Sequence, residues 1–475
     1  MVFMEADMVG LSFIILGIFL FIGKWLRVLI PLFQRLFLPS SLIAGLLALI
    51  VGPEVLGQIF DLFTSEDFVL QQGFIPEEVL LAWEELPGLF INIVFASLFI
   101  GKDLPSIRKM WDIGGAQVVM GQLLSWGQYV IGLVLVIFIL TPIFDVNPLV
   151  AGLIEISFVG GHGTAAGLAG TFNELGLEEG TDLALGLATV GVLSGVIIGI
   201  IFINWGARTG KAQEISENQG IKMEEETGII EFDDREPAAQ LTTKPESVEA
   251  LSIHFAYIGI AIGVGAILLE GLVQLEQFTW GAWTDIELMV HVPLFPLAMV
   301  GSIIVQILSN LFDKYNIIDR GMINRISGFS LDILIVSALG TVSITAIGDN
   351  FVPFIILGAA GLIWNVLAFL YLAPKMIPTN WFERGIGDFG QATGISATGL
   401  LLIRIADPQS NTTSLEGFGY KQILFEPLVG GGLFTAASTP LIAQLGPVTV
   451  LIIAGIVTIA WLLIGIFYFG RKNKG

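Results

Sequence analysis

The sequence contains no cysteine and only three histidines, His162, His254 and His291, in 475 residues. No disulfide, thiolate metal site or cysteine nucleophile can therefore form. The histidines stand far apart, and HExxH, GxSxG and Walker-type glycine motifs are all absent. An intramembrane enzyme would need a nucleophile–base pair or a metal cluster. The sequence therefore offers little support for catalysis.

Charge is also scarce. Charged residues make up only 13% of the chain, whereas soluble proteins carry about 25%. Acidic residues outnumber basic ones by 42 to 21, giving a formal net charge of −21, which argues against nucleic acid as a partner. Hydrophobic residues account for 54%. A crossing helix needs about 20 apolar residues, so the chain has room for roughly a dozen crossings. A water-soluble enzyme is excluded.

Long apolar runs predict two similar series of membrane segments. The first series is Met8–Phe21, Pro39–Val51, Leu89–Ile100, Gly115–Ile139, Leu149–Leu168 and Ala184–Ile203. The polar stretch Ala207–Ala250 follows, with no apolar run long enough to cross. The second series is Leu251–Val273, Leu288–Leu308, Ser330–Ile347, Val352–Leu372, Gly385–Ile403, Gln422–Ala443 and Val448–Phe469.

The distribution of Lys and Arg predicts the orientation, because these residues prefer cytoplasmic loops. The segment Gly52–Gly88 has no Lys or Arg but many acids. It is flanked by basic loops that follow the first and third spans and hold Lys24, Arg27, Arg35, Lys102, Arg108 and Lys109. We therefore expect the acidic segment and the N-terminus outside, and the central linker and the C-terminus in the cytoplasm.

Two segments break the alternation of sides. Leu149–Leu168 has no Lys or Arg on either flank, whereas Gly385–Ile403 has basic residues on both. If each dips into the membrane and returns to the side it entered, all 21 Lys and Arg residues become cytoplasmic. If both cross fully, the basic clusters between them move outside. The re-entrant interpretation is favoured.

This reading predicts an all-α integral membrane protein with an inverted-topology repeat of two five-helix modules, each with a re-entrant broken segment. The first module covers residues 1–206, an acidic cytoplasmic linker residues 207–250, and the second, inverted module residues 251–443. One extra C-terminal helix and a tail occupy residues 444–475. For the linker we expect a solvated connector.

Both dips combine glycine with polar side chains, in Glu155–Thr164 and in Gly387–Gly399. Glycine breaks a helix and frees backbone groups, which lipid penalises unless they bind something. Half-helix N-termini favour an anion, and freed carbonyls with Ser or Thr hydroxyls suit a small hard cation. Close helix packing would explain one such cluster. Two clusters at matching places favour one site built from two tips near the membrane midplane.

The stretch Gly160-Gly161-His162-Gly163-Thr164 resembles the signature of the bacterial sodium/glutamate symporter family. In the second half, the resemblance continues at Gly387, Gly390, Gly394, Ser396 and Thr398, with Pro427–Gly430 and Leu38-Pro39 as further similar stretches. It implies a sodium-driven importer of L-glutamate in the bacterial inner membrane. It also implies a homodimer in which a transport domain moves against a fixed one, with sodium as coupling ion and no cofactor.

Site residues follow from the dips and the resemblance together. Expected substrate-binding residues are Gly160, Gly161, His162, Gly163, Thr164, Gly390, Gln391, Thr393, Gly394, Ser396, Thr398 and Arg404. Expected cation-binding residues are Glu155, Ser157 and Asp388. Intramembrane carboxylates default to functional roles, although Glu155 can also be a neutral carboxyl and Asp388 a solvated one. Arg404 serves either as a bidentate carboxylate ligand or as a topology anchor.

Three alternatives to glutamate symport stay open. A sodium- or proton-coupled transporter of another carboxylate is the nearest, because Glu155 and Asp388 offer acidic groups in the dips. An ion channel also accommodates inverted broken segments, and an intramembrane enzyme is the least supported class.

Overall fold

The computed structural model describes residues 6–63, 73–212, 214, 227–284, 287–408 and 411–473. Glu66 and Asp67 of the acidic segment, residues 215–226 of the linker and Lys474 lie outside these ranges. Throughout the described ranges the secondary structure is helical, and they contain no β-strand. The prediction of an all-α protein is confirmed.

The first half of the chain folds into a series of helices separated by short turns. They are α1 (Ala6–Leu29), α2 (Pro31–Arg35), α3 (Ser40–Val51), α4 (Gln58–Phe63), α5 (Glu77–Ala96), α6 (Ile107–Leu135), α7 (Thr141–Phe144), α8 (Leu153–Phe158), α9 (Gly161–Gly167), α10 (Ala169–Glu174) and α11 (Gly180–Thr209). A 3-10 turn, Pro148–Gly152, leads directly into α8.

The second half, after the linker, folds into a further series of helices. Its helices are α13 (Ala250–Phe278), α14 (Leu294–Phe312), α15 (Arg320–Gly340), α16 (Ile344–Asp349), α17 (Phe351–Tyr371), α18 (Ala373–Met376), α19 (Trp381–Ala406), α20 (Ser414–Phe425), α21 (Leu433–Leu445) and α22 (Pro447–Leu463). Among the described residues, eleven helices are long and apolar enough to cross a membrane, judged by length and composition. The multi-pass membrane prediction is confirmed at that level.

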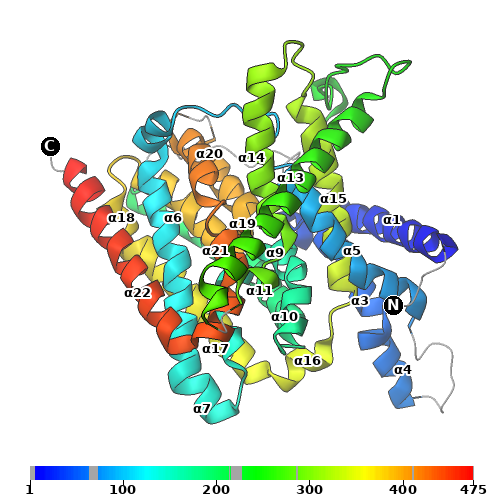
Figure 1. The fold of residues 1–475 in the computed structure, drawn as a ribbon, viewed down its shortest axis with the longest axis horizontal. Helices are drawn as coiled ribbons and strands as arrows, with labels where there is room; N and C mark the ends of the chain where they lie inside the picture. Colours follow the sequence, from blue (N-terminus) through cyan, green and yellow to red (C-terminus); the bar gives the residue numbers. More distant parts are fainter. Residues whose placement is uncertain are drawn as a thin grey trace.

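The helices pack into two groups, and each group draws on both halves of the chain. α1, α3 and α5 pack with α13, α14 and α15. α6, α8, α9 and α11 pack with α17, α19, α20 and α22. In Figure 1 the first group lies mainly on the right and α6, α17 and α22 lie on the left, with α9, α11 and α19 between them. The main contacts between the groups are made by α9 with α5 and α15.

Side-chain contacts also tie the groups together. His291, in the connection from α13 to α14, accepts a hydrogen bond at its carbonyl from Thr171 Oγ1, at 3.0 Å, and its ring pairs with Glu174 at 3.2 Å. Asp182 of α11 accepts a hydrogen bond at 2.8 Å from the backbone N–H of Ser343, just before α16. Within the first group, His254 of α13 has a structural role, because its Nε2 accepts a hydrogen bond at 2.7 Å from the backbone N–H of Asp319, just before α15.

Several predicted boundaries differ from the observed ones, and two of these differences have a clear cause in the sequence. α5 begins at Glu77, twelve residues before the expected Leu89, because four acids (Glu77, Glu78, Glu84 and Glu85) are carried on its first turns. The expected span Gln422–Ala443 is instead two helices, α20 and α21. Gly430 and Gly431, both with positive φ, lie in the connection between them. The prediction missed this break because the residues form one long apolar run. Pro427 and the three glycines that follow it were the available signal for a break.

Candidate functional site

The first broken segment turns at Gly161, where α8 has ended and α9 begins. Gly161 has a φ of +72°, which side chains rarely adopt and glycine adopts readily. At the other end of the segment, Asn147 Nδ2 donates to the carbonyl of Gly176 at 3.0 Å. The two ends of the segment therefore lie side by side, and the chain between them forms a helical hairpin with its tip at Gly160–Gly161.

The second broken segment is α19, which changes direction at Gly394 and Ile395. Ile395 has a φ of 69° and a ψ of 170°, outside the helical region. A Cβ added to Gly387 would lie 2.4 Å from Ile403 Cδ1, and one added to Gly390 would lie 2.8 Å from Gly399 Cα. These pairs are spaced evenly about the break, so the two arms run antiparallel. α19 is a hairpin and not one straight helix.

The tips of the two hairpins meet. A Cβ added to Gly161 would lie 2.2 Å from Ile395 Cγ2. α11 supports the second tip, since a Cβ added to Gly191 would lie 2.3 Å from Thr393 O, and one added to Gly394 would lie 2.9 Å from Val192 Cα. Residues with unusual backbone conformations from both halves of the chain are thereby placed in contact.

The other residues of the first motif divide by role. His162 Nε2 lies 3.0 Å from Thr189 Oγ1 of α11, and Thr164 Oγ1 donates to Gly160 O at 3.0 Å. Gly163 instead faces the other helix group, where its Cβ would lie 3.2 Å from Ile91 Cδ1. His162 and Thr164 are therefore at the tip, and Gly163 allows α9 to approach α5.

Glu155 is fully buried on α8 and is held by three donors. Its Oε1 accepts from Gly430 N at 2.8 Å and from Thr435 Oγ1 at 3.2 Å, and its Oε2 accepts from Tyr129 OH at 2.5 Å. The carboxylate thus links the first hairpin to α6 and to the turn before α21. Two residues later on the same helix, the buried Ser157 Oγ has no hydrogen-bond partner among the described residues. Its hydroxyl oxygen is therefore free to accept.

Two buried amides that the sequence analysis missed stabilise the second tip. Gln128 Nε2 of α6 and Asn365 Nδ2 of α17 each donate to Ala392 O at 2.7 Å. Asn365 Nδ2 also lies 3.1 Å from Thr393 Oγ1. They satisfy a carbonyl close to the break, as a buried broken helix requires. The available signal was Asn365 as the one amide in its span, and Gln128 as one of three glutamines in Gly115–Ile139.

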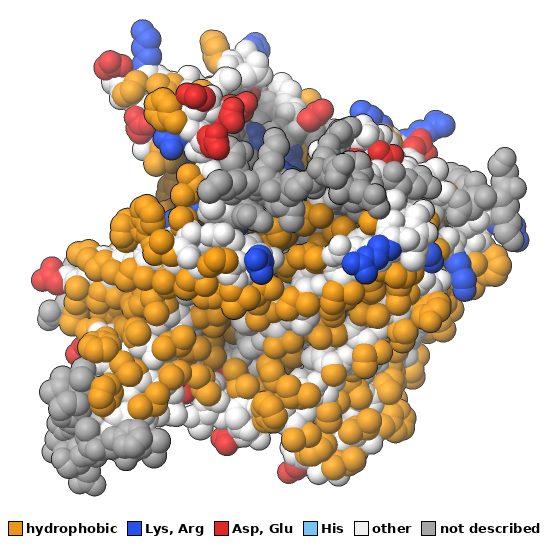
Figure 2. All heavy atoms as spheres, turned by 180° about the vertical axis from the view of Figure 1, so that it is seen from behind, with side chains coloured by type: hydrophobic (Ala, Val, Ile, Leu, Met, Phe, Trp, Pro, Cys, Tyr) orange, Lys and Arg blue, Asp and Glu red, His pale blue; other side chains and the backbone are white. Residues whose placement is uncertain are grey.

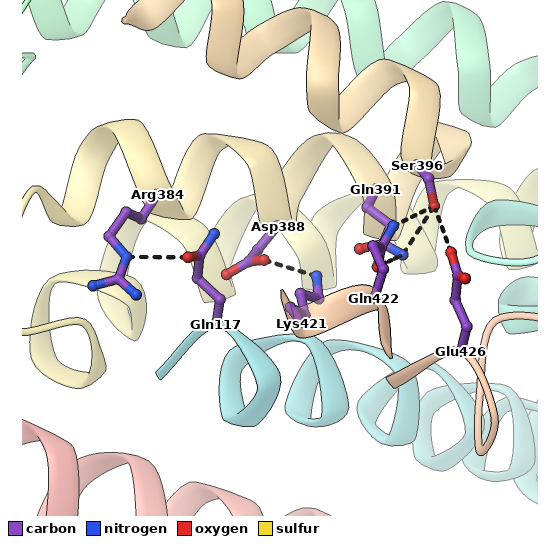
Figure 3. Close-up of polar contacts among 8 residues, drawn as sticks. All are labelled: Gln117, Arg384, Asp388, Gln391, Ser396, Lys421, Gln422 and Glu426. Carbon is purple, nitrogen blue, oxygen red and sulfur yellow. Dashed lines mark hydrogen bonds and ion pairs between the residues drawn. The ribbon is translucent and has the colours of Figure 1, made fainter. Parts of the chain in front are cut away.

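A line of buried polar side chains runs along the first arm of α19 (Figure 3). Gln391 Nε2 donates to Gln422 Oε1 at 2.9 Å, Gln422 Nε2 to Ser396 Oγ at 2.6 Å, and Ser396 Oγ to Glu426 Oε1 at 3.4 Å. Further from the tip, Lys421 Nζ contacts Asp388 Oδ1 at 2.7 Å. In the sequence, Lys421 is one of the basic residues that follow the dip Gly385–Ile403, where a cytoplasmic loop was expected. That expectation is wrong for Lys421, because it is buried on α20 inside the helix group.

One basic group outside the crossing helices also faces this line. Burial lowers the pKa of the Lys102 ammonium, and the negative charge of Glu426 opposes that shift. Lys102 precedes α6, so the loop between α5 and α6 brings positive charge toward the end of the polar line.

A cavity of about 340 Å³ opens beside the second tip. Ile395, Ala397, Thr398 and Arg404 line it from α19, and Arg27 of α1 lines it from the other helix group. The remaining lining residues are Phe37, Pro39, Val192, Val196, Leu400 and Leu401. Two guanidinium groups therefore share a cavity with a broken helix and a Thr hydroxyl, which suits a ligand carrying carboxylates.

Comparison with known proteins identifies the family. A search of curated proteins found no match to the chain. The family model for the sodium/glutamate symporter matches residues 7–380, which include the first hairpin and end just before α19. The resemblance found in the sequence is confirmed over that range. The chain belongs to the sodium/glutamate symporter family.

Proposed function

We propose that the protein imports L-glutamate in symport with sodium, through a site where the two hairpin tips meet. The approach of Gly161 to Ile395 is the observation that carries this proposal. Family membership points to a transporter rather than an enzyme. The second hairpin lies beyond the range of the family match, so its part in the site rests on the contacts described above.

The substrate site combines positive charge with acceptors. Arg404 and Arg27 line the cavity at the second tip and supply bidentate partners for carboxylates. The substrate ammonium requires acceptors, which carbonyl and hydroxyl groups of Gly160–Thr164 and Gly390–Thr398 supply. Within that set, Gly390 has a packing role, because the second arm of its own hairpin lies against it.

For sodium we propose oxygen ligands close to the hairpins. Glu155 and Ser157 lie in the first hairpin, and both are buried. Asp388 of the second hairpin, the third expected cation ligand, is also buried, but the cation that it contacts is the Lys421 ammonium. A hard cation favours carboxylate, hydroxyl and carbonyl oxygens. The open hydroxyl of Ser157 supports this assignment more directly than Glu155 does, since Glu155 already accepts three hydrogen bonds.

We also propose that the hairpins are re-entrant from opposite faces, in an inverted repeat of residues 1–206 and 251–443. The paired ends of the first hairpin and the antiparallel arms of α19 support this. On the face shown in Figure 2, the described Lys and Arg side chains gather on one side of a broad apolar belt. The other side of that belt shows acidic charges, which supports an external N-terminus and a cytoplasmic linker.

The two helix groups suggest how transport proceeds. We propose that the group holding both hairpins moves against the group of α1, α3, α5 and α13–α15, in a homodimer in the bacterial inner membrane. α22, from the C-terminal part of the chain expected to hold one extra helix, packs on α6 within the moving group.

Uptake into proteoliposomes tests the function. Labelled L-glutamate is supplied with sodium and proton gradients imposed independently. We expect accumulation driven by the sodium gradient and abolished by its collapse. Uptake driven equally well by a proton gradient without sodium would contradict sodium coupling. Transport of a different carboxylate in place of glutamate would contradict the substrate.

A further inference from the structure

The ion pair between Asp388 and Lys421 is buried completely. The Asp388 side chain is 0% exposed, the Lys421 side chain is 1% exposed, and Nζ lies 2.7 Å from Oδ1. Asp388 belongs to the first arm of the α19 hairpin and Lys421 to α20. Figure 3 shows the two side chains pointing toward each other across the gap between these helices.

A glycine of α6 and two aromatic rings of α20 surround the end of the Lys421 side chain. On α6, a Cβ at Gly121 would lie 2.5 Å from Lys421 Cε and 2.9 Å from Nζ, so only glycine leaves room for the lysine. The rings of Phe418 and Phe425 lie 5.2 and 4.9 Å from Nζ. Ring faces attract a cation. The ammonium therefore rests between two aromatic rings and one carboxylate.

Asp388 retains unused capacity as an acceptor. Its Oδ2 is buried and has no hydrogen-bond partner among the described residues. Arg384, one turn earlier on the same helix face, donates instead to Gln117 Oε1 at 3.1 Å and to Ile113 O. One turn later, the buried Gln391 Oε1 also lacks a hydrogen-bond partner among the described residues. Two acceptor oxygens on one face of α19 are thus left open, and one of them belongs to the carboxylate that contacts the ammonium.

Such a pair contributes little as a structural device. Taking two charges out of water offsets most of their attraction, and well-packed apolar residues often give equal or greater stability. Ionisable groups inside a membrane protein are costly and point to ion handling. The Asp388 carboxylate, with Oδ1 on the ammonium and Oδ2 open, has the chemistry of a cation site. Lys421 is the cation that occupies it.

We propose that Lys421 acts as a tethered cation, filling at Asp388 a site that would otherwise take a monovalent cation such as sodium from solution. The wild-type protein thereby carries one fewer ion from solution in each cycle. This inference is additional to the proposed glutamate symport, and it concerns a site that can be tested without any substrate.

The test compares four forms of the full-length protein: wild type, Lys421→Met, Asp388→Asn with Lys421→Met, and Lys109→Met. The last is a matched control, since Lys109 also lies over an α20 ring, at 5.8 Å from that of Tyr420. The Tm of each is measured in sodium chloride and in choline chloride at equal ionic strength. A ligand that binds only the folded state stabilises it by RT ln(1 + c/Kd) at a free ligand concentration c, so Tm rises with the ligand concentration.

Lys421→Met should gain a rise of Tm that increases with sodium concentration, beyond that of wild type and of Lys109→Met. The double variant should lose this gain, because its site has no carboxylate. An unchanged sodium response in Lys421→Met, or a gain that persists in the double variant, would overturn the proposal. So would a Lys421→Met protein that unfolds in both salts while the double variant folds, because sodium would then not replace the ammonium.

Uptake measurements give a second readout. In Lys421→Met the Hill coefficient for sodium should rise by about one relative to wild type, consistent with one more ion bound from solution. Absence of glutamate uptake by wild type would count against the proposed function alone. The Tm comparison would still decide whether Lys421 occupies a cation site.

Discussion

Gly161 of α9 and Ile395 of α19 touch at the tips of two broken helices, and a Cβ on Gly161 would lie 2.2 Å from Ile395 Cγ2. Both residues have positive φ, at 72° and 69°. The unfavourable backbone conformation of Ile395 is therefore held against a left-handed residue that only glycine adopts readily. Strain of this kind persists where the surrounding structure enforces it, and it gathers at ligand sites.

Gly161→Val should reduce uptake at least about tenfold. A side chain in the left-handed region costs about 1–2 kcal/mol, and overpacking costs about 1–3 kcal/mol more. The measurement is sodium-driven uptake at matched membrane levels. Gly170→Ala is the control within the same hairpin, because a Cβ there would meet nothing within 4 Å. Near-normal uptake by Gly161→Val would contradict a role of Gly160–Thr164 in the transport site and would leave these residues a packing role only.

Thr164→Val should abolish uptake while lowering stability by only about 1 kcal/mol, the usual worth of one hydrogen bond. Valine keeps nearly the same volume but removes the hydroxyl that bonds to Gly160 O. Thr458→Val is the control, since Thr458 makes the same kind of bond, to Ala454 O at 2.7 Å, on α22. Equal uptake by the two variants would show that the Thr164 hydroxyl has no special role.

Glu155→Ala should destabilise the protein more than Glu155→Gln. Alanine leaves the buried donors of Gly430, Thr435 and Tyr129 without their acceptor. Each such orphan costs about 1–3 kcal/mol, whereas glutamine keeps one acceptor oxygen. Thermal unfolding of the purified variants measures the difference. Equal Tm values would mean that these donors find other partners.

Arg404→Lys should raise the KM for glutamate with a smaller change in maximal rate. Lysine keeps the positive charge in the cavity but cannot form a bidentate pair with a carboxylate. Arg208→Lys, an exposed change in the last turn of α11, is the control. An unchanged KM in Arg404→Lys would favour the alternative interpretation of Arg404 as a topology anchor.

The sequence predicts the position of two helix breaks, because clustered glycines break a helix and free backbone groups that must then be bound. The third break, between α20 and α21, has the same glycine signal. It was missed because the flanking residues complete an apolar run of crossing length. The length and hydropathy of an apolar run do not indicate which partners its backbone N–H and C=O groups bind.

Contacts between distant residues were beyond prediction for a different reason. Asp388 and Lys421 are 33 positions apart, and only the packing of α19 against α20 and α6 brings them together. Gln128 and Asn365 appear in the sequence as amides in two separate spans, with nothing to indicate that both donate to the carbonyl of Ala392. Polar residues in apolar spans signal that a partner exists, but the fold chooses the partner.

The opposed entry of the two hairpins is tested most directly by labelling single cysteines in right-side-out vesicles, since the native chain has no cysteine. The positions are Asp145 and Glu178 around the first hairpin, and Thr379 and Thr413 around the second, all of them exposed. An impermeant thiol reagent should modify the first two and spare the last two until the membrane is permeabilised. Modification of only one member of either pair would mean a complete crossing there, and would contradict a site formed by two tips from opposite faces.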